Sequence, residues 1–138
     1  MLSGVWTIGI KVPDLERELA FHQSLGNSLV LDETLELGGE RFRIPLVRMG
    51  DKYLHLAEKM VYERLLKQPL PFGIVHVVYR SDSFDEDVKK ALASDATLIG
   101  DVANVSAGFG ERRVAFFRAP SGWIFEIIEI LKNLVPEV

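Results

Sequence analysis

The alternation of apolar and polar residues divides the first half of the chain into short strands around one helix. Asp14 follows a β-branched apolar run and is a suitable N-cap for the amphipathic stretch after it. Gly38-Gly39 separates two strand-like runs and predicts a hairpin between them. The predicted elements are a strand at 5–12, a helix at 15–25, and strands at 28–37, 40–50 and 52–58.

The second half shows the same order of elements. Ser83 is the expected N-cap of its helix, and the Gly-rich residues 103–111 are expected to form a loop able to act as a mobile lid. The predicted elements are a strand at 73–80, a turn and helix at 81–94, and strands at 96–102, 112–119 and 123–131.

Both halves therefore follow the order strand, helix, strand, strand, strand, with a period of about 70 residues. Residues 59–72 between them contain a short helical stretch and two prolines, which is typical of a connector. We predict one α+β domain over 1–138, built of module A (4–58), linker (59–72) and module B (73–131). Two such βαβββ modules would form a cup-shaped mixed sheet around one cavity.

Four polar residues interrupt apolar strands at matching places of this repeat. Aligning the halves puts Thr7 opposite His76, and His55 opposite Glu126. Strand alternation places each side chain on one face of its sheet, so the curled modules would direct them into the same cavity. A buried isolated carboxylate is unfavourable, so Glu126 must be paired, metal-bound or in contact with water.

Two imidazoles and a carboxylate on three strands suit a divalent metal with open coordination positions. His55, His76 and Glu126 are therefore the candidate metal ligands, and the metal charge would offset the cost of burying Glu126. Two simpler interpretations remain open: Glu126 pairs with Arg112 or Arg113, and His76 is a hydrogen-bonded core histidine.

Composition limits the classes of function. Hydrophobic residues make up 48% of the chain, enough for a sizeable core, and the net charge is −4 without a basic stripe. There is no cysteine, which excludes disulfides and thiolate chemistry. No apolar run is long enough to cross a bilayer and no signal peptide is evident, so we expect a cytoplasmic protein without nucleic-acid or membrane partners.

Three stretches resemble the vicinal oxygen chelate superfamily, which includes glyoxalase I, methylmalonyl-CoA epimerase, extradiol dioxygenases, fosfomycin-resistance enzymes and bleomycin-binding proteins. They are "IGIKVPDLERELAFHQSLG" near the start, "GIVHVVYR" in the middle and "FFRAPSGWIFEIIE" near the end. The last is similar to the turn-and-strand signature of that superfamily. The resemblance implies paired βαβββ modules that face a metal.

The superfamily takes its metal ligands from the first and last strand of each module, which here carry Thr7, His55, His76 and Glu126. Thr7 stands where glyoxalase I has a His or Gln ligand, and His55 stands where it has a Glu. The resemblance therefore implies a divalent metal (Fe, Mn, Zn, Ni or Co) held by the two histidines and Glu126. A water or substrate oxygen would take the place next to Thr7, which we assign to substrate binding.

Further candidates flank this set. Tyr53 lies on the predicted face of His55 and is expected either to line the cavity or to donate a proton, so Tyr53 and Glu126 are the catalytic candidates. Arg43, with Arg41 on the same side of its strand, would anchor a substrate carboxylate or form a solvated face. His22 is expected to have no site role and either to pack in the helix or to lie on the surface.

The resemblance implies an enzyme that binds two vicinal oxygens of a small-molecule substrate and stabilises an enolate or oxyanion intermediate. The short chain favours lyase or isomerase chemistry over ring-cleaving dioxygenase chemistry. The alternative is a metal-free protein that binds a small molecule or antibiotic, like the bleomycin-binding members. We expect a homodimer in either case.

Overall fold

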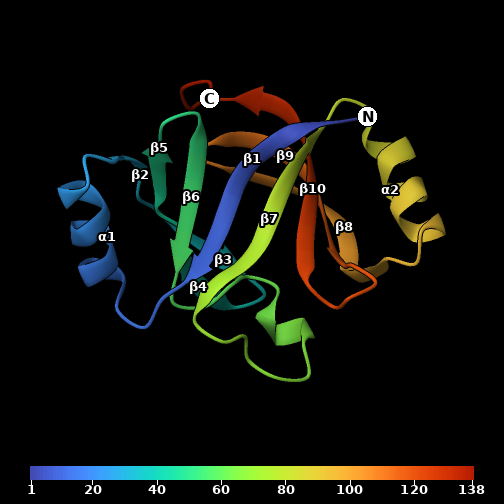
Figure 1. Ribbon diagram of the computed structural model, residues 1–138, viewed down its shortest axis with the longest axis horizontal. Coiled ribbons are helices and arrows are strands. Elements are labelled where there is room, and N and C mark those ends of the chain that lie inside the picture. Colours follow the sequence, from blue (N-terminus) through green and yellow to red (C-terminus); the bar gives the residue numbers. More distant parts are fainter. The chain divides into compact units, whose positions relative to one another are not determined.

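The computed structural model describes all 138 residues. Two helices accompany ten strands (Figure 1). In chain order the elements are β1 (Leu2–Lys11), α1 (Leu15–Ser24), β2 (Ser28–Leu31), β3 (Thr34–Leu37), β4 (Glu40–Arg43), β5 (Leu46–Met49), β6 (Lys52–Ala57), the short 3-10 turn η1 (Glu63–Leu65), β7 (Gly73–Ser81), α2 (Phe84–Ala93), β8 (Thr97–Ala107), β9 (Gly110–Arg118) and β10 (Ile124–Asn133).

The chain divides into two compact units. The N-terminal unit comprises Thr7–Val75 and Pro136–Val138, and the C-terminal unit comprises Met1–Trp6 and His76–Val135. Each unit contains one helix and the strands that follow it, as the repeat predicts. The unit boundaries fall inside β1 and β7, so the first residues of β1 belong to the C-terminal unit.

The sheet of the N-terminal unit has the order β2-β5-β6-β1. β1 runs parallel to β6, whereas β5 is antiparallel to both β6 and β2. α1 lies against one face of this sheet (Figure 1). The core between them is aliphatic because helix and strands each present an apolar side: Val12, Leu15, Leu19, Val47, Leu54 and Leu56.

The start of α1 is fixed by side-chain capping. Asp14 has an extended backbone and accepts a hydrogen bond from the backbone N–H of Arg17, as predicted for an N-cap. The side chain of Glu58 accepts a hydrogen bond from the backbone N–H of Leu15 at 3.1 Å. Two carboxylates thus stabilise the positive end of the helix and tie it to the residue that follows β6.

The predicted strands 28–37 and 40–50 are each broken in two, which corrects the sequence-based boundaries. Only β3 and β4 form the hairpin at Gly38-Gly39, while β2 and β5 pair with each other in the main sheet. Pro45 separates β4 from β5 because it has no N–H for a strand ladder. The unit is therefore a βαβββ module with the β3–β4 hairpin inserted.

The sheet of the C-terminal unit has the order β7-β10-β9-β8, with β7 parallel to β10 and the remaining pairs antiparallel. α2 contacts β10 and β8. Its core contains Phe84, Ala115, Phe117 and Ile127. This unit is also a βαβββ module, so the predicted α+β fold of two modules is confirmed.

The predicted Gly-rich loop 103–111 is wrong. β8 continues to Ala107 and β9 starts at Gly110, so only a tight turn remains and no mobile lid is present. Gly110 has φ +113°, and a Cβ there would collide with the carbonyl oxygen of Lys132. Gly110 thus serves this close approach of strands rather than flexibility.

A buried arginine holds the end of β10. Arg112 is 1% exposed, and its guanidinium donates hydrogen bonds to the carbonyl of Lys132 at 2.6 Å and to Asn133 Oδ1 at 2.9 Å. It also donates to the carbonyl of Phe109 and lies 5.0 Å from the ring centre of Trp6. Arg112 thus orders this end of the strand, and the proposed pairing of Arg112 with Glu126 is absent.

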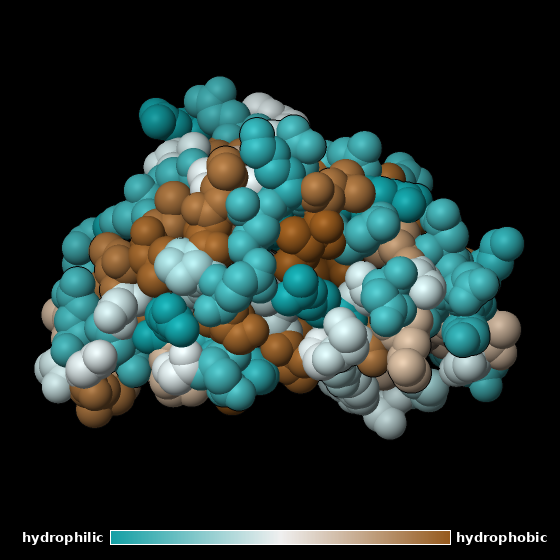
Figure 2. Space-filling model, turned by 90° about the horizontal axis from the view of Figure 1, so that it is seen from above, coloured by the Kyte–Doolittle hydropathy of each residue, from teal (hydrophilic) through white to brown (hydrophobic).

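Several apolar side chains reach the surface (Figure 2). Phe21 and Leu25 at the end of α1 are 52% and 61% exposed, and Ile74 at the start of β7 is 73% exposed. Exposed side chains of this kind are available for subunit contacts.

Neither helix has the length and apolar composition needed to cross a bilayer.

A buried ion pair connects β1 with the linker in the N-terminal unit. Lys11 Nζ lies 2.9 Å from Glu63 Oε2 and donates a second hydrogen bond to the carbonyl of Leu70 at 2.8 Å. Glu63 Oε1 accepts from the N–H of Met60 at 2.8 Å. Burial raises the pKa of Glu63, but these hydrogen bonds outweigh it and hold the pKa below its usual value.

We expect Glu63→Ala to reduce the free energy of unfolding by roughly 3–5 kcal/mol, because it leaves the Lys11 ammonium buried without its partner. The surface pair of Lys59 with Glu40 provides the control: Glu40→Ala should cost less than about 1 kcal/mol. Urea unfolding at pH 7 measures both. Because the pKa of Glu63 is lowered in the folded state, its contribution to the free energy of unfolding should be lost as the pH falls through that pKa. Equal losses for the two variants would contradict this interpretation.

Candidate functional site

Glu126 lies on β10 among apolar neighbours. Val78 of β7 and Phe116 of β9 are its partners in the two strand pairings, and Ile124 and Ile128 share its face. Protein atoms surround the carboxyl group, although the residue as a whole keeps some exposed surface. This burial raises the pKa of Glu126 to about 8. Without a nearby cation, the carboxyl is therefore mainly protonated at neutral pH.

His76 lies beside Glu126 on the neighbouring strand. It pairs with Ile124, two residues before Glu126, so both polar side chains project from the same face of the β7–β10 pair. His76 is 4% exposed, and its ring meets Phe116 edge-on at 6.0 Å between centres. The C-terminal unit thus brings together two of the three predicted metal ligands.

The N-terminal unit repeats this arrangement. Thr7 on β1 pairs with Tyr53 on β6, two residues before His55, and Gly9 pairs with His55 itself. Thr7 therefore occupies the register position of His76, and His55 that of Glu126. The strand pairing confirms the alignment of the two halves that the sequence suggested.

His55 carries an uncharged imidazole. Its Nε2 atom is buried, and burial lowers the pKa of His55 to about 4. The imidazole is therefore uncharged at neutral pH, the form that binds metal ions. Within neither unit do three His, Asp or Glu side chains gather in a geometry able to hold a metal ion.

Tyr53 is completely buried, and its hydroxyl donates a hydrogen bond to the carbonyl of Pro136 at 2.6 Å. Burial raises the pKa of Tyr53 and Glu137 adds to this, while Arg48 opposes it. The phenol consequently keeps its proton at neutral pH. Its contact with the C-terminal residues was not predictable from the sequence, because 83 residues separate the two partners.

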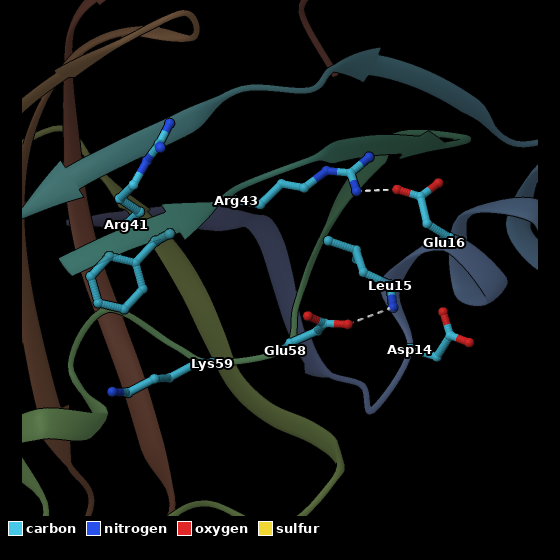
Figure 3. Close-up of a pocket in the computed structure, with 8 residues that line it drawn as sticks. Asp14, Leu15, Glu16, Arg41, Arg43, Glu58 and Lys59 are labelled. Carbon is cyan, nitrogen blue, oxygen red and sulfur yellow. Dashed lines mark hydrogen bonds and ion pairs between the residues drawn. The ribbon is translucent and has the colours of Figure 1, made fainter.

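Arg43 lies at a different place in the N-terminal unit, in a pocket of about 420 Å³ between the start of α1 and β4 (Figure 3). Its guanidinium binds both carboxylate oxygens of Asp32, at 2.9 and 2.7 Å, and also pairs with Glu16. These carboxylates raise the pKa of Arg43 above its usual value. Arg41, which points away from Arg43 in Figure 3, is exposed and lies 3.6 Å from Glu36.

His22 is buried on α1, and its Nδ1 lies 3.4 Å from Asn27 Nδ2. This is the packing role that the sequence predicts for it.

Arg113 lies between Asp85 and Glu129 and covers the ring of Phe84, so it is not the partner of Glu126.

Comparison of the sequence with protein-family models and with curated proteins gives no match. Solved structures do match. Methylmalonyl-CoA epimerase of Streptomyces coelicolor, a variant in complex with 2-nitronate-propionyl-CoA, has a TM-score of 0.73 at 20% identity, over 96% of this chain and 100% of that one.

A hypothetical protein of Bacillus halodurans C-125 has a TM-score of 0.72 at 23% identity, over 94% of this chain and 96% of that one. A fusion of a xylose isomerase-like TIM barrel with 4-hydroxyphenylpyruvate dioxygenase has a TM-score of 0.67 at 17% identity, over 94% of this chain and 26% of that one. This chain has the vicinal oxygen chelate fold. The resemblance of the three sequence stretches is thereby confirmed at the level of the fold.

The raised pKa of Glu126 predicts a pH-dependent stability in buffer containing a chelator. Because the pKa of this carboxyl is higher in the folded state, the free energy of unfolding falls as the pH rises. The fall extends from the pKa in the unfolded chain, about 4.3, to the pKa in the folded protein, about 8. We expect Glu126→Gln to be more stable than the wild type by roughly 2–4 kcal/mol at pH 7, and equally stable at pH 4.5. Urea unfolding at both pH values measures this difference.

Glu129→Gln is the matched control, because Glu129 lies on the opposite face of β10 and pairs with Arg113 at 3.3 Å. It should change the free energy of unfolding by less than about 1 kcal/mol. A Glu126→Gln effect that is the same at both pH values would contradict a buried, uncharged carboxyl.

Proposed function

We propose that this chain is a divalent-metal-dependent enzyme that binds two vicinal oxygens of a small substrate and stabilises an enolate or oxyanion intermediate. The observation that carries this proposal is the buried Glu126 beside His76 on one face of a parallel strand pair. An acid in such a place is a functional-site candidate, because its burial is unfavourable unless a ligand or reaction uses it. The fold supports the same interpretation.

We assign the metal to His55, His76 and Glu126. The donor chemistry fits, since His55 is neutral at physiological pH and Glu126 supplies an anionic oxygen once it loses its proton. When bound, the cation would supply Lewis-acid stabilisation of negative charge that develops on a substrate oxygen. The set of two imidazoles and one carboxylate leaves coordination positions for substrate oxygens.

The residues around this set have separate tasks. The Glu126 carboxyl would give up its proton when a cation binds, which makes binding stronger at higher pH. Tyr53 would line the site, because its one phenolic proton is donated to the carbonyl of Pro136. Phe116 and the aliphatic residues beside Glu126 would exclude water from the reacting atoms.

We favour isomerase chemistry. The fold neighbours include methylmalonyl-CoA epimerase, whose complex contains a CoA ester analogue, and a dioxygenase fusion. Abstraction of a proton next to a carbonyl would produce an enolate, which an electropositive site stabilises. The substrate class is a small acid or acyl thioester with two neighbouring oxygens.

We further propose that the chain acts in the cytoplasm as a homodimer.

The second candidate is a metal-free protein that encloses a small molecule. It is favoured by the observation that neither unit alone gathers three metal-binding side chains. It predicts that the histidines and Glu126 serve packing only.

Metal analysis of protein purified without chelator distinguishes the two. We expect about one divalent ion per chain, retained after gel filtration, because two imidazoles and a carboxylate are a tight-binding ligand set. His76→Ala and Glu126→Gln should each lose the ion while remaining folded by circular dichroism. His22→Gln and Glu129→Gln, changes outside the assigned set, should retain it.

A wild-type protein that binds no added Mn²⁺, Zn²⁺ or Ni²⁺, with both site variants folded, would support the metal-free alternative. Retention of the ion by His76→Ala and Glu126→Gln together would contradict the assigned ligand set.

A further inference from the structure

The pocket between the start of α1 and β4 has no part in the proposed function. Its volume of about 420 Å³ is typical of a small-molecule site. Six of its eight lining residues are charged: Asp14, Glu16, Arg41, Arg43, Glu58 and Lys59. The helix α1 packs on Leu54 and Leu56 of β6, whereas His55 points to the other face of that strand. The pocket is therefore separate from the candidate metal ligand of this unit.

The charges of the pocket are divided between its two sides. Arg41 and Lys59 lie on one side in Figure 3. Asp14 and Glu58 lie on the other side, where α1 begins. The pocket thus has a basic side and an acidic side.

The two carboxylates of the acidic side make no ion pair. Asp14 Oδ1 accepts from the backbone N–H of Arg17, and Glu58 Oε2 accepts from that of Leu15, each at 3.1 Å. The second oxygen of each carboxylate is unused, and both residues are exposed. The start of α1 is already satisfied by these two carboxylates, so this side of the pocket suits a cationic group and not an anion.

The two cations of the basic side are held only by surface ion pairs. Arg41 Nε lies 3.6 Å from Glu36 Oε1, and these side chains are 73% and 75% exposed. Lys59 Nζ lies 3.2 Å from Glu40 Oε2, and both side chains are about half exposed. Exposed pairs of this kind contribute little to stability, so both cations are available to a carboxylate of a ligand.

Arg43 adds no unpaired charge to the pocket, because its guanidinium pairs with Glu16 and with both carboxylate oxygens of Asp32. The lining as a whole carries three positive and three negative side chains. The partners Asp32, Glu36 and Glu40 add further negative charge. A polyanion such as a nucleotide would be repelled here, whereas a ligand with one charge of each sign would be bound at both sides.

We propose that this pocket binds a linear zwitterion of the ω-amino acid class. Its ammonium group pairs with Asp14 and Glu58, and its carboxylate pairs with Arg41 and Lys59. The apolar lining residues, Leu15 and Phe42, suit an aliphatic chain between the two charged ends. This binding requires neither a metal ion nor any residue assigned to the proposed function.

The first test compares 6-aminohexanoate with hexanoate and hexylamine, which each lack one of its two charges. Calorimetry with the full chain at pH 7 measures the three dissociation constants. We expect 6-aminohexanoate to bind at least about fivefold more tightly than either analogue, because it alone makes charged hydrogen bonds at both sides. Binding should weaken at higher ionic strength, since the groups involved are exposed.

The second test uses charge-removing variants of the two sides. Glu58→Gln keeps an oxygen for the N–H of Leu15 but removes the negative charge, and Lys59→Gln removes a positive charge. Each should weaken the binding of 6-aminohexanoate about fivefold or more. Glu86→Gln and Lys89→Gln, exposed positions on α2, are the matched controls and should leave it unchanged.

Three results would overturn the inference. They are no binding of 6-aminohexanoate at millimolar concentration, equally tight binding of hexanoate or hexylamine, and an affinity unchanged in both pocket variants. Metal binding that depends on His76 and Glu126 would persist in each case, so this inference and the proposed function fail separately.

Discussion

Each unit joins its first and last strands as a parallel pair, and four of the candidate site residues are placed by this pairing. A parallel register fixes which side chains share a face, because partners and residues two positions away point to the same side. β1 with β6 sets Thr7 beside His55, and β7 with β10 sets His76 beside Glu126. The two pairs have the same offset, so a duplicated backbone arrangement carries different side chains.

The two pairs differ in the side chains that they carry. In the C-terminal unit an imidazole lies next to a carboxyl that burial keeps protonated. In the N-terminal unit a neutral imidazole lies next to an unsatisfied hydroxyl. The buried acid of one pair and the buried hydroxyl of the other are each unfavourable in the free protein.

Sequence periodicity was sufficient for the repeat, the two helices and the strands that carry the site. The β-branched runs around His76 and Glu126 have only one plausible secondary structure, and Asp14 marks the start of α1 clearly. The alignment of Thr7 with His76 followed from element order. These features depend on local residues and on spacing along the chain.

Other features depend on contacts between residues far apart in sequence and could not be read from it. The ion pairs of Arg43 with Glu16 and Asp32 join residues that are 27 and 11 positions apart. The Gly-rich stretch looked like a lid, but Gly110 packs tightly against β10. The hydrogen bond of Tyr53 to Pro136 and the unsatisfied hydroxyl of Thr7 required the assembled sheet.

Anomalous diffraction from crystals grown with Zn²⁺ would show which residues hold a metal ion, because it locates the ion without reference to activity. We expect one strong peak at about 2.0–2.2 Å from nitrogen atoms of His55 and His76 and from a carboxylate oxygen of Glu126. A peak bound elsewhere, with no ion next to Glu126, would contradict this assignment.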